Sequence, residues 1–127
     1  MKTKITIFIL LFWGFFSLAQ SNTANDEKSV YKLYPTTNIS TFLKLDTSIG
    51  QVFQVHFDIT GDERVEYIIN PMELVNDDDV YTGRFELYPT QNMYNFLLLD
   101  KKDGRIWQTQ WSHDWKNRGI LPFKTIK

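Results

Sequence analysis

The chain carries one sequence unit twice, and this repetition limits what it can fold into. Residues 31–57 align without a gap on residues 85–111, at an offset of 54, and the two copies share eleven identities among twenty-seven positions. The shared pattern is Leu-Tyr-Pro-Thr-x-Asn, then Phe-Leu-x-Leu-Asp, then Gly-x-x-Phe/Trp-Gln. Past it the match fades, although Arg64 still aligns with Arg118. The fold must therefore be built from two similar units.

Each copy has the pattern of a β-meander. Phe53, Val55 and Phe57 alternate with a second set that includes Gln54 and His56, so the two sets lie on opposite faces of a strand. No segment after residue 20 shows a sustained 3.6-residue apolar period, which indicates an all-β fold. The predicted strands are residues 31–34, 41–45, 51–57 and 65–69 in the first copy and 84–88, 94–100, 105–111 and 120–126 in the second.

We therefore expect two tandem antiparallel β-meanders that form a small sandwich or barrel with pseudo-twofold symmetry. A single β domain should cover residues 30–127, with repeat 1 at 30–70, repeat 2 at 84–127 and a linker at 71–83 that could include a helical turn at 72–75. A less favoured alternative is a two-blade propeller fragment that is completed by self-association.

The first twenty residues have the parts of a secretory signal peptide. Lys2 and Lys4 precede an apolar run over residues 5–16, and small residues follow before Gln20. The run is shorter than the roughly 20 residues that a membrane-spanning helix needs, so a cleaved signal is favoured over an uncleaved anchor. We expect a secreted or periplasmic protein with a polar leader at residues 21–29 and no membrane span after cleavage.

Composition excludes several classes of site. The chain has no cysteine, which excludes disulfides, thiolate metal sites and a cysteine nucleophile, and we expect no cofactor. Its formal net charge of −1 argues against nucleic-acid binding, which needs a clustered basic surplus.

Aromatic residues make up 16% of the chain and suggest a binding platform or a core filled with rings. Trp107 and Trp111 replace Phe53 and Phe57 at equivalent positions, which favours a core role for both tryptophans. The repeated mid-strand glutamines could satisfy neighbouring backbone groups or face a ligand groove. The candidate ligand-binding residues are Trp115, Tyr34, Tyr88, Gln54 and Gln108.

A weak calcium pattern follows the first repeat. Asp58, Thr60, Asp62 and Glu66 offer oxygen ligands at alternating spacing. The pattern of a calcium-binding loop has glycine at the position of Glu63, and a hairpin turn explains the same residues better.

Groups that could catalyse a reaction are few. Asp46 and Asp100 could form a carboxylate pair, but both begin a turn that ends in glycine, which favours a role in the turn. His56 and His113 do not align with each other and are expected at the surface. The sequence leaves enzymatic activity uncertain and favours a protein without it.

The repeated unit resembles a short β repeat of uncharacterised exported proteins of Gram-negative, Bacteroides-like bacteria. The resemblance covers about half of the chain, residues 31–57 and 85–111, and implies a β architecture in the bacterial envelope without catalytic residues. We expect a non-catalytic binding or interaction module for a protein or glycan, which could also form homo-oligomers. The alternatives are a small hydrolase-like enzyme that uses a histidine with nearby carboxylates, and a calcium-stabilised β module.

Overall fold

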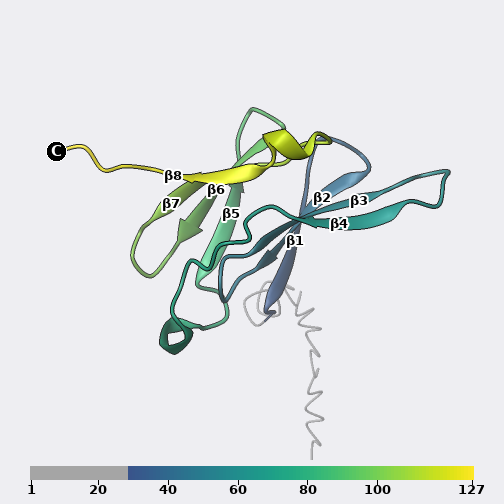
Figure 1. Cartoon of the computed structure of the whole chain (residues 1–127). Helices are drawn as coiled ribbons and strands as arrows, with labels where there is room; N and C mark the ends of the chain where they lie inside the picture. Colours follow the sequence, from purple (N-terminus) through teal and green to yellow (C-terminus); the bar gives the residue numbers. More distant parts are fainter. Residues whose placement is uncertain (1–28) are drawn as a thin grey trace, which may run out of the picture.

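The computed structural model describes residues 29–127 and contains two four-stranded antiparallel sheets (Figure 1). The predicted signal peptide at 1–20 and nearly all of the leader at 21–29 lie outside the described residues. The first sheet consists of β1 (Tyr31–Pro35), β2 (Thr41–Asp46), β3 (Val52–Phe57) and β4 (Arg64–Ile68). The second consists of β5 (Phe85–Pro89), β6 (Asn95–Asp100), β7 (Ile106–Gln110) and β8 (Gly119–Pro122).

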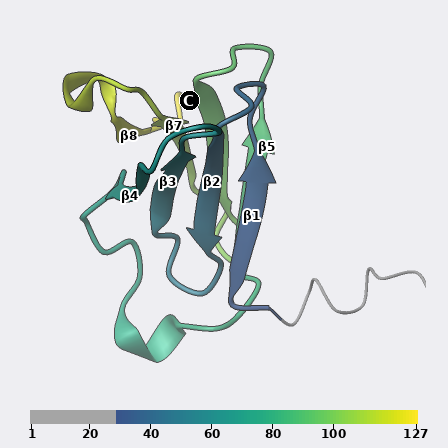
Figure 2. The same ribbon diagram turned by 90° about the vertical axis from the view of Figure 1, so that its right-hand side faces the viewer.

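The predicted fold class is confirmed. Each sheet has its strands in chain order, and the two sheets lie as successive layers of an open sandwich rather than a closed barrel (Figure 2). Strand β8 is shorter than the predicted 120–126. The linker forms its helical turn at η1 (Asp77–Asp79) and not at 72–75, and a second short helix, η2 (Trp115–Asn117), had no counterpart in the prediction.

The β2–β3 and β6–β7 turns confirm the role predicted for the repeated aspartates. Asp46 Oδ1 accepts a 2.9 Å hydrogen bond from Ser48 N, and Asp100 Oδ1 accepts the equivalent 3.0 Å bond from Lys102 N. Each turn ends in a glycine with positive φ, 77° at Gly50 and 79° at Gly104. A side chain there would strain the backbone, which explains why both copies keep glycine.

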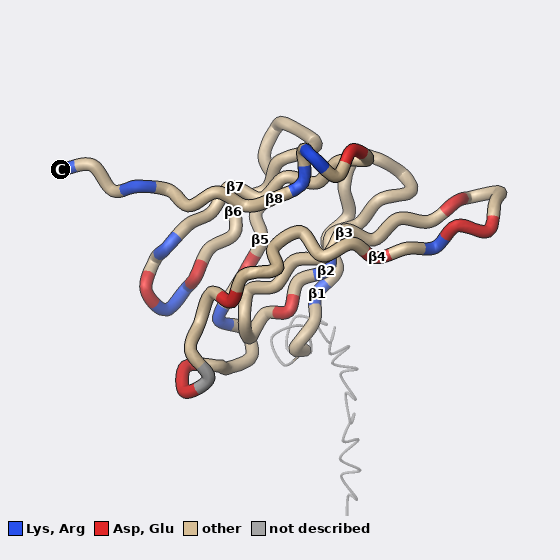
Figure 3. Tube along the Cα trace, in the orientation of Figure 1, with Lys and Arg blue, Asp and Glu red and all other residues tan. Residues whose placement is uncertain are grey.

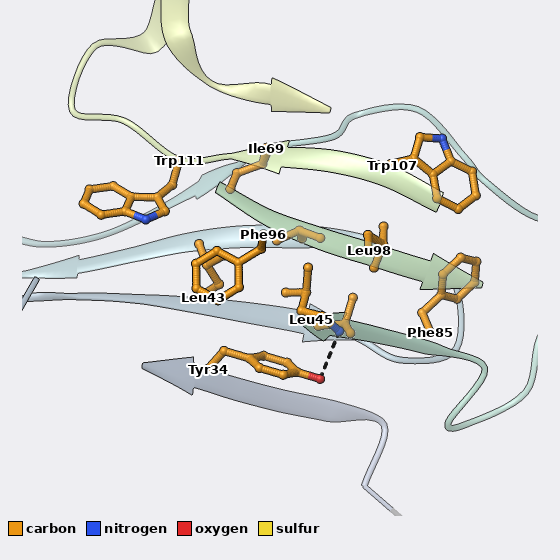
Figure 4. Packing of buried hydrophobic residues seen from close by; sticks show 11 residues of the cluster. Tyr34, Leu43, Leu45, Ile69, Phe85, Phe96, Leu98, Trp107 and Trp111 are labelled. Carbon is orange, nitrogen blue, oxygen red and sulfur yellow. Dashed lines mark hydrogen bonds between the residues drawn. The ribbon is translucent and has the colours of Figure 1, made fainter. Parts of the chain in front are cut away.

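One apolar core lies between the two sheets (Figure 4). The face of each sheet that contributes to it is called the inner face, and the opposite face is called the outer face. The buried side chains of the first inner face include Tyr34, Leu43, Leu45, Val52 and Gln54, and those of the second include Phe85, Leu87, Phe96, Leu98, Trp107 and Trp111. The core role predicted for Trp107 and Trp111 is confirmed.

The inner faces of the two sheets are not built from equivalent residues. Strand register places Tyr34, Leu43 and Gln54 in one row across the first sheet, and all three are buried. Their equivalents Tyr88, Leu97 and Gln108 also form one row, but on the outer face of the second sheet.

The converse holds for the other face. The second inner face carries Leu87 and Phe96, whose equivalents Leu33 and Phe42 lie on the first outer face. A twofold axis would bring equivalent faces together. In the structure, the face of the first repeat that enters the core is not equivalent to the face of the second repeat that it contacts. The relation between the repeats is therefore head-to-tail and not pseudo-twofold as predicted.

The two turn glycines offer a matched test of this packing. A Cβ at Gly50 would lie 2.8 Å from the Phe85 ring, whereas a Cβ at Gly104 would meet no atom within 4 Å. Gly104→Ala should cost about 1–2 kcal/mol of unfolding free energy from backbone strain alone. Gly50→Ala should cost about 2–5 kcal/mol, because overpacking against Phe85 adds about 1–3 kcal/mol. Urea unfolding measures both, and equal losses would contradict the close contact of the β2–β3 turn with β5.

Candidate binding surface

The outer faces of both sheets expose apolar side chains between charged hairpins. Charge gathers on the β3–β4 and β6–β7 hairpins, while much of the strand surface is uncharged (Figure 3). The first outer face presents Leu33, Phe42, Phe53, Val55, Phe57 and Ile68, and the second presents Tyr88, Leu97, Leu99, Ile106 and Leu121. Lys44, Glu66 and Arg64 share the first of these faces. Exposed apolar side chains gathered on a sheet face often mark a binding surface.

Two of the five predicted ligand-binding residues lie inside the sandwich. Burial raises the pKa of Tyr34, and its hydroxyl accepts a 3.3 Å hydrogen bond from Leu87 N of the opposite sheet. Gln54 is fully buried, and its Oε1 accepts hydrogen bonds from Ser112 N and Arg118 Nε, both at 3.1 Å. Tyr34 and Gln54 therefore join the two repeats and are not part of an exposed ligand surface.

Tyr88 and Gln108 remain accessible on the second outer face. They belong to the cross-strand row Tyr88, Leu97, Gln108 and Leu121. Tyr88 donates to Glu86 Oε2 at 3.1 Å, and Gln108 Nε2 donates to Asn95 Oδ1 at 2.6 Å. Tyr88 and Gln108 are therefore the two predicted ligand-binding residues that lie on an accessible sheet face.

Trp115 is highly exposed in η2, near one end of the second sheet. A hollow of about 350 Å³ lies between η2 and β7–β8. It is lined by Gln108, Gln110, Lys116, Asn117, Arg118, Gly119, Ile120 and Leu121. Its amides and cations are mixed with aliphatic side chains, so this end of the surface could also accept polar groups.

The structure brings the two histidines together, which the repeat alignment did not indicate. The ring centroids of His56 and His113 are 5.3 Å apart, and the rings meet edge to face. His56 Nδ1 lies 3.3 Å from Thr41 Oγ1, and its Nε2 lies 3.9 Å from Asp58 Oδ1, longer than a hydrogen bond. His56 is half-buried rather than at the surface as predicted, while His113 is exposed.

The residues of the calcium pattern have other partners in the β3–β4 hairpin. Asp58 Oδ2 accepts a 3.2 Å hydrogen bond from Glu63 N, and Glu66 forms an ion pair with Lys44. Thr60 and Asp62 are exposed at the hairpin tip. Within residues 29–127, no three acidic or histidine side chains gather as metal ligands do.

A charged cluster distinguishes the second repeat from the first. The Arg84 guanidinium donates two hydrogen bonds to the Asp100 carboxylate, at 2.9 and 2.7 Å, and both residues are buried. Burial alone would raise the pKa of Asp100, but hydrogen bonds from Arg84, Lys102 N and Arg105 lower it to about 2. The first repeat has Val30, Ile49 and Gln51 in place of Arg84, Asp103 and Arg105, so the cluster could be found in the sequence only as a set of differences between the repeats.

The cluster lines one side of a polar cavity of about 430 Å³, and residues 73–76 of the linker line the other part. Arg84 also donates to Asp79 O at 2.8 Å, and Arg105 pairs with Asp103 at 2.6 Å. Lys102 pairs with Asp79 at 2.6 Å and lowers the pKa of that carboxyl. Because these charges are already paired with each other, the arrangement fixes the β6–β7 turn and linker and does not supply a proton donor or acceptor near neutral pH.

The buried ion pair makes stability depend on pH. In the unfolded chain Asp100 takes up a proton near the ordinary aspartate pKa of 3.8, whereas the folded group does so only at about 2. The unfolded chain therefore binds more protons in this range, and stability falls as pH falls from about 5 to 2. Urea unfolding across this range should show a loss about 2 kcal/mol larger for the wild type than for Asp100→Asn. Identical pH profiles would contradict this role of Asp100.

A comparison of equivalent aspartates isolates the ion pair from the turn. Asp100→Asn leaves the buried Arg84 without the carboxylate that accepts its two hydrogen bonds, although Asp103 stays 3.9 Å away, and should cost about 3–5 kcal/mol at pH 7. Asp46→Asn changes the equivalent turn residue, where an amide oxygen can still accept the Ser48 hydrogen bond, and should cost less than about 1 kcal/mol. Thermal and urea unfolding of both variants would measure the difference. Similar losses would show that Asp100 acts only in the turn.

No protein family, curated protein or solved structure matches this chain. The resemblance to exported β-repeat proteins therefore stays a prediction. In the described part of the chain, no helix has both the length and the apolar character that crossing a membrane requires. Any functional conclusion depends on the geometry of the sheets.

Proposed function

We propose that this protein is an exported, non-catalytic interaction module of the bacterial cell envelope that binds protein through the outer faces of its sheets. One observation carries the proposal: the second outer face exposes Tyr88, Leu97 and Gln108, residues identical to three that are buried between the sheets in the first repeat. Side chains suited to a packed interface are thus kept on a surface where this chain alone does not cover them.

The composition of this surface fits protein partners. Aromatic and aliphatic anchors surrounded by polar groups are typical of protein interfaces. Tyr88 is 42% exposed and Leu121 is 68% exposed, and both belong to the same cross-strand row. The charged β6–β7 hairpin and η2 border the second sheet and supply polar groups beside this apolar area (Figure 3).

A sugar-stacking platform has less support. Such a platform needs several exposed rings on one surface. Tyr34, Trp107 and Trp111 are buried. The exposed rings are spread over the structure: Tyr88 lies in β5, whereas the others lie in β1, the linker, the β5–β6 loop, η2 and the segment after β8, namely Tyr31, Tyr81, Tyr94, Trp115 and Phe123. Apolar contact with a protein therefore uses more of the exposed residues than glycan stacking does.

Site-specific photo-crosslinking in living cells tests the proposal. Benzoylphenylalanine would replace Tyr88 or Leu121 on the second outer face, or Tyr81 in the linker as a control with 46% exposure. We expect covalent adducts from positions 88 and 121, at least fivefold above the yield from position 81. The reason is that only the first two positions would lie in an interface.

Mass spectrometry would identify the crosslinked species. Equal yields at all three positions, or no adduct at positions 88 and 121, would contradict a binding role for this face. Comparable expression and protease resistance of the three proteins would show that the substitutions leave the fold intact.

A further inference from the structure

The repeat alignment and the strand register together specify a surface that fits another copy of this chain. The first inner face packs on the second inner face. The second outer face carries the equivalents of the first inner face, and the first outer face carries the equivalents of the second inner face. The two outer faces are therefore related to each other as the two packed faces are.

We propose that the partner of the outer faces is a second copy of this protein, stacked head-to-tail so that the second sheet of one copy packs on the first sheet of the next. This inference rests on the proposed binding function and names its partner. The contact between copies repeats the contact between the two sheets within one copy.

The apolar residues on both sides fit this arrangement. Leu33 is 59% exposed on the first outer face, whereas its equivalent Leu87 is 2% exposed in the core. Ile106 is 37% exposed on the second outer face, whereas its equivalent Val52 is fully buried. Packing alone within the chain gives no reason to keep large apolar side chains at Leu33 and Ile106, but packing between copies does.

The polar contacts between the sheets also have both partners in place for a second copy. Within the chain, Arg118 Nε donates to Gln54 Oε1 at 3.1 Å. The repeat equivalents are Arg64 on the first outer face and Gln108 on the second. Stacking would bring Arg64 of one copy to Gln108 of the next.

A second polar contact follows the same rule. Leu87 N donates to the Tyr34 hydroxyl at 3.3 Å between the sheets, which is drawn as a dashed line in Figure 4. The equivalent contact would join Leu33 N of one copy to the Tyr88 hydroxyl of the next. Tyr88 already donates its proton to Glu86, so its oxygen can act as the acceptor.

Charge is complementary as well. Lys32 and Glu86 approach within 3.7 Å and form an ion pair between the two sheets. They occupy equivalent positions in the repeats, so the head-to-tail contact would again place Glu86 of one copy beside Lys32 of the next. Two lysines or two glutamates at these positions would have repelled each other across both contacts.

The first outer face carries charged residues at two positions where its buried equivalent is apolar. Lys44 and Glu66 stand where the second inner face has Leu98 and Ile120, and they form an ion pair with each other. The Lys44 ammonium lies 4.4 Å from the centroid of the Phe53 ring, so its aliphatic stem covers apolar surface. This pair adds no net charge to the face, but two charged groups replace two apolar ones, so the contact between copies should be weaker than the contact within one.

The symmetry of the contact has a consequence that distinguishes it from an ordinary dimer. A head-to-tail interface uses two different faces, so each copy leaves one of each kind available for the next. The assembly closes into a ring if the rotation between copies closes, and it continues as a filament if it does not. In a twofold dimer, by contrast, each copy would use the same face.

Variants blocked on one face test this directly. Leu33→Glu blocks the first outer face and Ile106→Glu blocks the second, while Ile126→Glu, at a 92% exposed position in the C-terminal segment beyond β8, is the control. The proteins are expressed from the complete coding sequence, purified and analysed by sedimentation equilibrium over a concentration series. We expect the mass of the wild type and of Ile126→Glu to rise at least twofold with concentration.

Mixing completes the test. Leu33→Glu alone and Ile106→Glu alone should stay monomeric, because each lacks one of the two required faces. An equimolar mixture should form a dimer, because one variant supplies the intact second face and the other the intact first face. Circular dichroism and urea midpoints equal to those of the control would show that both variants fold. If Ile106→Glu is destabilised, Leu121→Glu on the same face replaces it.

Three results would overturn the inference. A wild type that stays monomeric at all concentrations would do so, as would a mixture that stays monomeric. Dimers formed by either single variant alone would also do so, because they would indicate contact between like faces. Photo-crosslinks from position 88 to a different protein, with a monomeric wild type, would refute self-association and leave the proposed binding function standing. The absence of any adduct from positions 88 and 121 would refute both.

Discussion

Packing between two unlike sheet faces holds this protein together, and the other features follow from it. The chain has no cysteine, so no disulfide limits its unfolded state, and each sheet alone would expose a whole apolar face. Burial of Leu43, Leu45 and Val52 against Phe96, Leu98 and Trp107 removes both faces from water. The β2–β3 turn reaches the start of β5, where Phe85 N donates to Thr47 O at 2.8 Å and fixes the lateral position of the sheets.

This arrangement changes what an identity between the repeats means. A residue kept in both copies of a twofold structure would serve the same contact twice. Here Tyr34 and Tyr88 are identical, yet one is buried with its hydroxyl bonded across the interface and the other is largely exposed. The same contrast holds for Gln54 and Gln108. Residues that are identical in the two repeats therefore indicate shared strand register and shared turns within each meander. They also indicate which positions on the outer faces are suited to packing.

Much of the fold could be predicted from the sequence because its determinants are local. Alternation gave the strands and the two faces of each, and the Asp-to-Gly spacing gave the hairpin turns. The choice between the two faces could not be predicted, because both faces of each meander are apolar enough to be buried. Phe53, Val55 and Phe57 predict a core face as strongly as their equivalents do, although they lie on the outer side.

The candidate site was less predictable for the same reason. Tyr34, Tyr88, Gln54 and Gln108 were grouped by residue type and repeat position, and the fold separates them by face. Contacts between the repeats, such as the edge-to-face pair of His56 and His113, join residues that do not align and so leave no repeated pattern. The Arg84–Asp100 pair was visible only as a difference, because Val30 occupies the equivalent position in the first copy.

The differences between the two repeats bear on the strength of the contact that we propose between two protein copies, relative to the contact between the two sheets of one chain. The buried inner face of the second sheet has Trp107, Trp111 and Leu98. The equivalent positions on the outer face of the first sheet have the smaller Phe53 and Phe57 and the charged Lys44. Each replacement reduces the apolar area that a contact could bury or adds a charge that must stay paired. The two sheets of one chain are also linked, so their association is not opposed by the loss of translational freedom that a second copy must overcome. The contact that we propose between two copies should therefore be weaker than the contact between the two sheets of one chain.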